Sequence, residues 1–274
     1  MKKLILFCLL FFSFVKADLL QDKIENIMRS DDVTLHRNLL NVLFKDRDKF
    51  YMSSNHERLN LPKVLSTLKT NGLLNLKFNH PTTFHAVFVF YGHTIKSLKV
   101  INDTLKSIGY YYYNIDEIQK DGDALYYSID FKTEYAIDPN ILYGELIKSN
   151  AKLINIEKIS QDNWKYFIDT RFSSLANATK VPNNEKVKLD KPLKPYFLEI
   201  NGARQLKIIN HRLNHWYPYL VFYDENLNVL KVYKNESAFR NATFNIPAYT
   251  KFIKISDLYN LINIKRGISI ILKK

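Results

Sequence analysis

One short stretch of this chain occurs twice, and the repetition restricts the possible folds more than any other feature. Residues 114–130 begin with Asn-Ile-Asp-Glu-Ile, and residues 155–169 begin with Asn-Ile-Glu-Lys-Ile. Each copy breaks at a polar turn that contains an aspartate, Asp121 or Asp162, and each follows a stretch of helical spacing that ends in Lys-Ser. We interpret the repeat as one supersecondary unit that is built twice.

The unit is predicted to be a strand, a helix and a second strand that enters a hairpin. Residues 84–91 are almost continuously apolar, which is typical of a strand buried on both faces. A helix is predicted from Thr94 to Gly109, and Asp138 followed by Pro139 marks the start of another. Two such units in tandem predict a ferredoxin-like α+β domain at residues 81–170, with a duplicated βαβ unit and both helices on one face.

A different pattern precedes this domain. Apolar residues recur there at three- and four-residue spacing, first at Leu20, Ile24, Ile27 and Met28 and then at Leu35, Leu39, Val42 and Leu43. This spacing favours amphipathic helices. Pro62 and Gly72 mark the start and stop of a further short helix. Residues 18–80 are therefore expected to form a helical N-terminal subdomain.

The C-terminal third of the chain predicts strands. Residues 171–195 contain Pro182, Pro192 and Pro195 and are expected to form a linker. Residues 196–274 are expected to form a β-sandwich of the jelly-roll type. The seven expected strands are Tyr196–Ile200, Gln205–Asn210, Tyr219–Tyr223, Asn228–Tyr233, Ala242–Ile246, Phe252–Ser256 and Ile268–Leu272. The whole chain is predicted to be an α+β multidomain protein.

The N-terminus is predicted to direct export. Lys2 and Lys3 precede an apolar run, and the chain reaches a small residue at Ala17, which is the layout of a signal peptide at residues 1–17. The apolar run is too short to cross a bilayer. Cys8 is the single cysteine, so cleavage after Ala17 leaves no thiol for disulfides, nucleophilic catalysis or metal binding. A periplasmic location is expected, with no transmembrane segment after cleavage.

Composition and charge narrow the choice of partner. The formal net charge is +13, and the lysines are scattered rather than grouped in a tail. For an exported protein, acidic partner proteins, peptidoglycan and anionic envelope polymers are more plausible partners than nucleic acid. The abundance of Lys, Asn, Ile, Tyr and Phe resembles that of exported periplasmic proteins of the Campylobacter type. That resemblance implies an accessory component of an envelope machine, such as the periplasmic scaffold around the flagellar motor.

A group of tyrosines in the repeated region is the first candidate contact surface. Its members are Tyr110, Tyr111, Tyr112, Tyr113, Tyr126 and Tyr127. If residues 110–113 form a strand, alternate rings point to opposite faces. One pair would then enter the core, and the other would join Tyr126 or Tyr127 on the open face. That patch either stabilises the sheet by cross-strand pairing or docks a protein, and base stacking is a third alternative.

Trp216, Tyr217 and Tyr219 form the second candidate surface. A tryptophan beside tyrosines at the entry of a strand suits stacking on a sugar ring, so these residues are candidate glycan contacts. The alternative interpretation is that Trp216 fills one end of the sandwich core.

Signatures of catalysis are missing from the sequence. The seven glycines are too dispersed for a dinucleotide fingerprint or a P-loop, and no Gly-x-Ser-x-Gly motif occurs. His211 and His215 lack the glutamate of a zinc-protease motif, and His80, His85 and His93 are interpreted as surface or hydrogen-bonding residues. We therefore expect no catalytic residue, no cofactor and no metal.

The expected function is that of a non-enzymatic periplasmic structural or adaptor protein, which mediates protein–protein contacts in an envelope assembly. The alternative is a cell-wall or glycan-binding protein that uses the C-terminal β-sandwich. A hydrolase with an unrecognised site is a third alternative.

Overall fold

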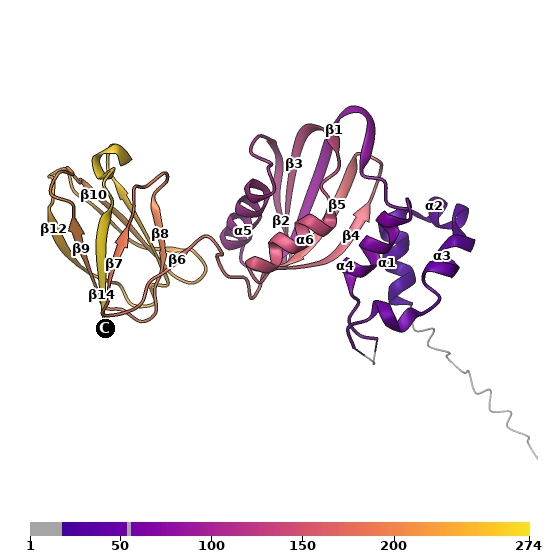
Figure 1. Cartoon of the computed structure of the whole chain (residues 1–274), viewed down its shortest axis with the longest axis horizontal. Coiled ribbons are helices and arrows are strands. Elements are labelled where there is room, and N and C mark those ends of the chain that lie inside the picture. The colour runs from indigo at the N-terminus through magenta and orange to yellow at the C-terminus, as the bar shows by residue number, and fades with distance from the viewer. Residues whose placement is uncertain (1–17, 54–55) are drawn as a thin grey trace, which may run out of the picture.

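The computed structural model describes residues 18–53 and 56–274 and builds them from six α-helices, two short 3-10 helices and fourteen strands. Helices lie at one end of the molecule, a sheet with two helices lies in the middle, and a second β region lies at the other end (Figure 1). The expectation of a chain that mixes helices with several sheets is confirmed. The signal peptide predicted at residues 1–17 lies outside the described residues.

Short helices open the described chain. They are α1 (Leu19–Met28), α2 (Ser30–Leu35), α3 (Arg37–Leu43), the 3-10 helix η1 (Arg47–Phe50) and α4 (Leu61–Thr70). The predicted apolar face of α1 is buried, and α4 begins beside Pro62 as expected. These helices share one buried apolar cluster with the sheet that follows them, and α1 contacts its edge.

The prediction that Leu35, Leu39, Val42 and Leu43 form the buried face of one helix is wrong. Three of its four residues are exposed, and these are Leu35, Leu39 and Val42. Val33 and Leu40 are buried instead. The chain changes direction at His36, which ends α2 and precedes α3, so the expected face does not run continuously along one helix.

A five-stranded sheet with two helices forms the middle of the molecule. Its strands are β1 (Lys77–Tyr91), β2 (Asn114–Asp121), β3 (Ala124–Tyr135), β4 (Lys152–Lys158) and β5 (Asn163–Asp169), and its helices are α5 (Thr94–Ser107) and α6 (Pro139–Lys148). The order across the sheet is β2-β3-β1-β5-β4, with β1 and β5 parallel and the other neighbours antiparallel. Each copy of the sequence repeat is the hairpin that follows one helix, and the two hairpins flank β1.

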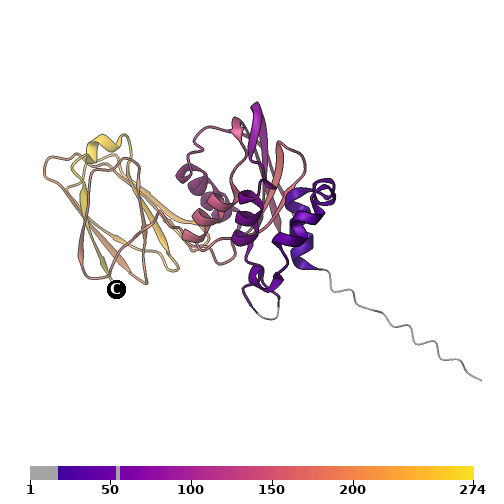
Figure 2. The ribbon, with the colours of Figure 1, turned by 45° about the vertical axis from the view of Figure 1, so that its right-hand side comes forward.

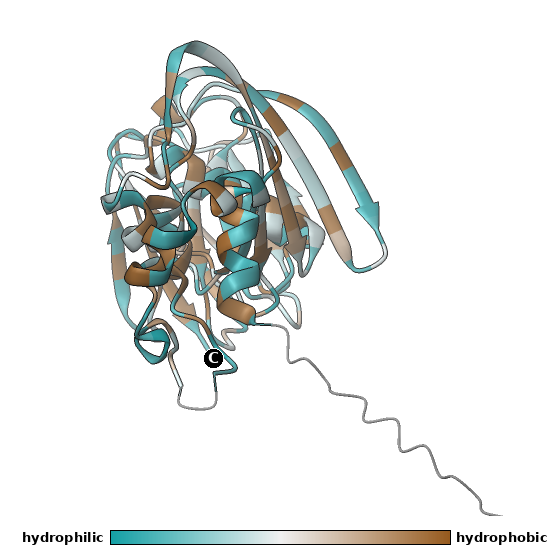
Figure 3. Ribbon diagram, turned by 90° about the vertical axis from the view of Figure 1, so that its right-hand side faces the viewer, coloured by the Kyte–Doolittle hydropathy of each residue, from teal (hydrophilic) through white to brown (hydrophobic). Residues whose placement is uncertain are grey.

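Alternation along the strands divides the sheet into two faces. Phe84, Phe88 and Phe90 of β1 are buried in the same cluster as the apolar residues of α5 and α6. His85 and Val87 point to the opposite face, because neighbouring residues of a strand alternate. Figure 3 shows the resulting change between hydrophilic and hydrophobic residues along the long strands. We call the side away from α5 and α6 the open face.

The start of α6 follows the sequence prediction. The side chain of Asp138 accepts a hydrogen bond from the backbone N–H of Asn140 at 2.9 Å, and it also forms an ion pair with Lys69 of α4. Pro139 occupies the first turn, where its missing N–H is not needed. Asp138 therefore caps α6 and links this helix to α4 through the ion pair with Lys69.

We expect Asp138→Ala to lower the free energy of unfolding by about 1–2 kcal/mol, because it removes both the cap and the ion pair. Lys69→Ala removes only the ion pair and is expected to cost less than about 1 kcal/mol. Urea denaturation of the two variants and the parent chain measures the difference. Equal losses in the two variants would contradict a capping role.

The C-terminal part consists of strands with one short helical turn. They are β6 (Thr179–Lys180), β7 (Lys186–Leu189), β8 (Tyr196–Glu199), β9 (Gln205–Asn210), β10 (Pro218–Tyr223), β11 (Val229–Lys234), β12 (Asn241–Asn245), β13 (Phe252–Asp257), the 3-10 helix η2 (Leu261–Ile264) and β14 (Ile268–Lys273). All seven predicted strands are present, within one or two residues of the expected ends. The predicted linker at residues 171–195 contains two further strands, β6 and β7.

Two sheets face each other in this part of the chain. One has the order β11-β10-β13-β8-β6 and the other the order β12-β9-β14-β7, and Figure 2 shows them as two layers. Their inner faces enclose a buried apolar cluster that includes Leu198, Ile208, Ile253 and Ile270. This enclosed cluster is the arrangement of a β-sandwich.

The sandwich also packs against the middle of the molecule. Leu227 and Phe252 belong to the buried apolar cluster of the five-stranded sheet, although they are part of the sandwich. Burial lowers the pKa of Lys96 on α5, and the nearby Glu225 and Glu199 of the sandwich oppose that shift. The contact between the two parts thus combines apolar packing with opposite charges.

Within the described ranges, every helix is too short or too polar to cross a bilayer.

Candidate functional site

The tyrosine run does not form the predicted strand. Residues 110–113 lie between α5 and β2, and the strand begins only at Asn114. The prediction that these tyrosines alternate along a strand is therefore wrong. Tyr110 packs on Phe131 with ring centroids 4.9 Å apart, whereas Tyr111 and Tyr112 are exposed.

The other members of the group are held in different environments. Tyr113 donates a hydrogen bond to the side-chain oxygen of Asn102 on α5. Tyr127 is buried beneath the helices, and this burial raises the pKa of its hydroxyl. Tyr126 is half-buried and lies on the open face, paired with Val89. The six rings thus form no single surface.

Trp216 is also not available to a ligand. It is 0% exposed, its ring packs edge-on against Phe244, and its indole N–H donates to the backbone oxygen of Ser256 at 2.8 Å. The prediction that Trp216 stacks on a sugar is wrong, and the alternative, a ring that fills the sandwich core, is correct. Tyr217 and Tyr219 are half-buried, against Tyr259 and beside the amine of Lys254 respectively.

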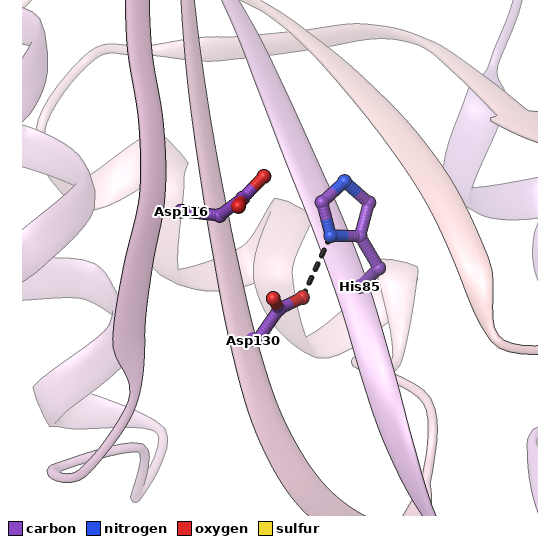
Figure 4. A group of neighbouring side chains, drawn as sticks. All are labelled: His85, Asp116 and Asp130. Atoms are coloured by element: carbon purple, nitrogen blue, oxygen red, sulfur yellow. Dashed lines mark hydrogen bonds and ion pairs between the residues drawn. The ribbon is translucent and has the colours of Figure 1, made fainter.

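A histidine and two aspartates meet on the open face of the five-stranded sheet. His85 of β1, Asp116 of β2 and Asp130 of β3 place potential ligand atoms within 4.8 Å of one another (Figure 4). Nδ1 of His85 lies 2.6 Å from a carboxylate oxygen of Asp130, and Ser128 donates to Asp116 at 3.1 Å. An imidazole with two carboxylates could hold a divalent transition metal. The hydrogen bonds present satisfy the same groups without an ion.

The other histidines considered in the sequence analysis do not join this group. Among the residues that the structure describes, no cluster with metal-ligand spacing includes His80, His93, His211 or His215. The Nδ1 atom of His211 accepts a hydrogen bond from the backbone of Leu213, which is a local turn contact.

An apolar cavity lies where α5 meets the sandwich, and we call it the junction cleft. It has a volume of about 770 Å³. Its apolar floor comes from α5, from the segment before β6 and from the sandwich, and it includes Ile95, Leu175, Phe197, Tyr223 and Leu227. This volume and this lining are typical of binding sites in proteins.

Charged residues also line the cleft, and we call them its rim. They are five lysines and two aspartates, namely Lys99, Lys188, Lys191, Lys194 and Lys254, with Asp103 and Asp190. Lys99 pairs with Asp103, and Lys188 lies 3.7 Å from Asp190. Within the described chain, the amines of Lys191 and Lys194 have no such partner. The rim therefore carries an excess of positive charge.

One rim segment is held in place by its own contacts. Residues 191–195 read Lys-Pro-Leu-Lys-Pro, and the two prolines restrict the backbone. The hydroxyl of Tyr196 donates to the backbone oxygen of Asp190 at 2.5 Å, which closes the segment at its base. Leu193 at its tip is 92% exposed. The segment thus presents a leucine between two unpaired lysines.

Tyr196 makes this segment sensitive to alkaline conditions. Burial raises the pKa of its hydroxyl to about 12, and the nearby Asp190 adds to the shift. The unfolded chain releases this proton near pH 10, its ordinary value, whereas the folded chain keeps it. The contribution of Tyr196 to stability is therefore complete below pH 10 and decreases as the pH rises toward 12.

We expect Tyr196→Phe to show a shallower loss of unfolding free energy between pH 10 and pH 12 than the parent chain, because its ring cannot ionise. Its stability at neutral pH is expected to be lower by about 1 kcal/mol, since the bond to Asp190 is lost. Urea denaturation at several pH values measures both effects. An identical pH dependence in the two proteins would contradict the assignment.

The lining of the cleft offers amines, carboxylates, aromatic rings and apolar side chains, which can contact a ligand. Sequence reasoning missed the site because residues 171–195 were interpreted as a linker. The alternation of lysines, prolines and one leucine at residues 191–195 was the available signal.

No protein-family model matches this sequence, and comparisons with curated proteins and with solved structures found no match.

Proposed function

We propose that this chain is a non-enzymatic adaptor protein of the bacterial periplasm, which holds a partner protein within an envelope assembly such as the scaffold of the flagellar motor. The junction cleft is the observation that carries this proposal. It combines an apolar floor with a charged rim, and such surfaces are typical of protein contact sites. The periplasmic location rests on the signal peptide predicted at residues 1–17.

The strand orders support a finer classification of the fold. Without β5, the order β2-β3-β1-β4 is that of a ferredoxin-like domain, so we propose a ferredoxin-like sheet with β5 inserted beside β1. Successive strands from β6 to β10 alternate between the two facing sheets, which supports a jelly-roll-like sandwich.

The proposal is tested by photo-crosslinking in the cells that produce the protein. A benzophenone amino acid is placed at position 193, on the rim of the cleft, in the full-length chain. A second variant carries it at position 262, where Ile262 of η2 is also exposed but does not line the cleft. We expect a discrete protein adduct from position 193 and none of that size from position 262.

Other outcomes would overturn the proposal. If neither position yields a protein adduct, the cleft does not hold a protein. Retention of the unmodified chain on isolated peptidoglycan, without any protein adduct, would favour the glycan-binding alternative. Turnover in a screen of envelope hydrolase substrates would contradict the non-enzymatic role.

A further inference from the structure

We propose that the occupant of the junction cleft is an extended, acidic segment of the partner protein, which adds as a strand to the free edge of the sandwich. This inference rests on the proposed function and names the chemistry of the partner at the same site.

The first argument is that unpaired strand edges reach the cleft. β7 is the last strand of the order β12-β9-β14-β7, and Lys188 and Leu189 at its end line the cleft. β8 is covered on its outer side by β6 only at Leu198 and Glu199, which leaves Tyr196 and Phe197 beyond the pairing. An edge strand offers backbone N–H and C=O groups to an added strand.

The second argument is charge. The lysines of the rim outnumber its two aspartates, and both aspartates already lie beside lysines. The amines of Lys191 and Lys194 are exposed and have no ion-pair partner in the described part of the chain. A segment rich in Asp and Glu complements this rim, whereas a basic segment would be repelled.

The third argument is the alternation of surfaces across the cleft. A strand directs successive side chains to opposite sides, so every second residue of a bound segment would face the floor at Phe197 and Tyr223. The residues between them would point outward, toward the lysines of the rim. The exposed Leu193 supplies an apolar contact at the edge of the cleft. The fitting sequence therefore alternates acidic and apolar residues.

An anionic lipid would match the charge and the apolar floor, but it has no backbone groups and would leave the strand edges unused. The edges are what favours a polypeptide over a lipid.

The test uses the full-length chain and a fluorescent peptide of alternating Glu and Val as the probe, with binding followed by fluorescence anisotropy. We expect the double variant Lys191→Glu, Lys194→Glu to weaken binding by at least about tenfold, because it reverses the unpaired charges of the rim. The matched control is Lys234→Glu, Lys265→Glu, which makes the same change of net charge at exposed positions outside the cleft. It is expected to change the affinity less than about twofold.

Two further probes separate strand addition from charge attraction alone. A peptide of the same sequence with alternate amides N-methylated keeps its charges and side chains but loses N–H donors. We expect it to bind at least about tenfold more weakly than the parent peptide. A peptide in which Lys replaces Glu is expected not to bind. Circular dichroism melting curves are recorded for every variant to check that it is folded.

The outcomes that overturn the inference are distinct from those that overturn the proposed function. Equal binding of the acidic and basic peptides, no binding of the acidic peptide, or equal binding of the N-methylated probe each contradicts an added acidic strand. Binding of phosphatidylglycerol vesicles in place of the peptide, abolished by the same double variant, would assign the cleft to a lipid. A crosslink from position 193 to a basic or neutral segment would overturn the inference while the adaptor function stands.

Discussion

Gly267→Ala will lower the free energy of unfolding by about 3 kcal/mol. Alanine disfavours the backbone conformation at this position, and its Cβ has no space there. Gly267 has φ of +76°, in the left-handed region that favours glycine. An added Cβ would lie closer than 3.0 Å to the backbone oxygen of Leu189 and 3.2 Å from two backbone atoms of Asp190. None of these three atoms can move without displacing the end of β7. Urea denaturation followed by circular dichroism measures the loss.

Gly202→Ala is the matched control for the steric part of this effect. Gly202 has φ of +67°, but a Cβ added there would meet nothing within 4 Å. We therefore expect only the conformational cost, about 1 kcal/mol. If the two variants lose the same stability, the close approach of Gly267 to β7 contributes nothing.

Trp216→Ala is expected to have the largest effect, a loss of about 3–5 kcal/mol, because it empties a buried site in the sandwich core. The indole fills the space beside Phe244, and its N–H satisfies the backbone oxygen of Ser256. Trp216→Phe keeps most of the volume and is expected to lose about 1–2 kcal/mol, mainly from the hydrogen bond. Urea denaturation monitored by circular dichroism reports both values.

Leu193→Ala provides the contrast for this prediction. Leu193 is almost fully exposed, so its truncation is expected to change stability by less than about 0.5 kcal/mol. A loss of peptide binding in Leu193→Ala would therefore report on the cleft. Any loss of sugar binding in Trp216→Ala would instead report on unfolding, so that variant cannot identify a glycan site. Unchanged stability of Trp216→Ala would contradict its position in the core.

Local sequence patterns predicted most of the individual elements. Asp138 and Pro139 located the start of α6, because a capping side chain and a fixed φ act within one turn of the chain. The alternation of apolar residues located all seven expected strands of the sandwich. The repeat at residues 114–130 and 155–169 correctly indicated two hairpins of the same kind.

The candidate surfaces were predicted less well, because they depend on contacts between distant parts of the chain. Tyr110 and Tyr113 look like strand residues by composition, but packing on Phe131 and the hydrogen bond to Asn102 hold them outside β2. The sequence left two alternatives for Trp216, a sugar-stacking ring and a core ring, because it does not show that Phe244 packs against it. The strand preference of a residue type does not show which of its neighbours will bury its side chain in the folded protein.

The junction cleft was not predictable for the same reason. Its lining comes from α5, from residues 175–179, from residues 188–197 and from β10, β13 and the β10–β11 connection. These segments meet where the sandwich packs against the middle of the molecule, for example at Leu227 and Phe197. Residues 191–195 appear as a linker when they are considered alone. Leu193 is a candidate contact residue only because the fold places it beside the apolar lining of the cleft.

The shared packing of Leu227 and Phe252 has a consequence for regulation. Because the lining of the cleft belongs to two parts of the chain, separation of these parts would remove some of the binding surface. Anything that separates α5 from the sandwich would therefore release the bound segment, and the bound segment would in turn oppose that separation by the same free energy.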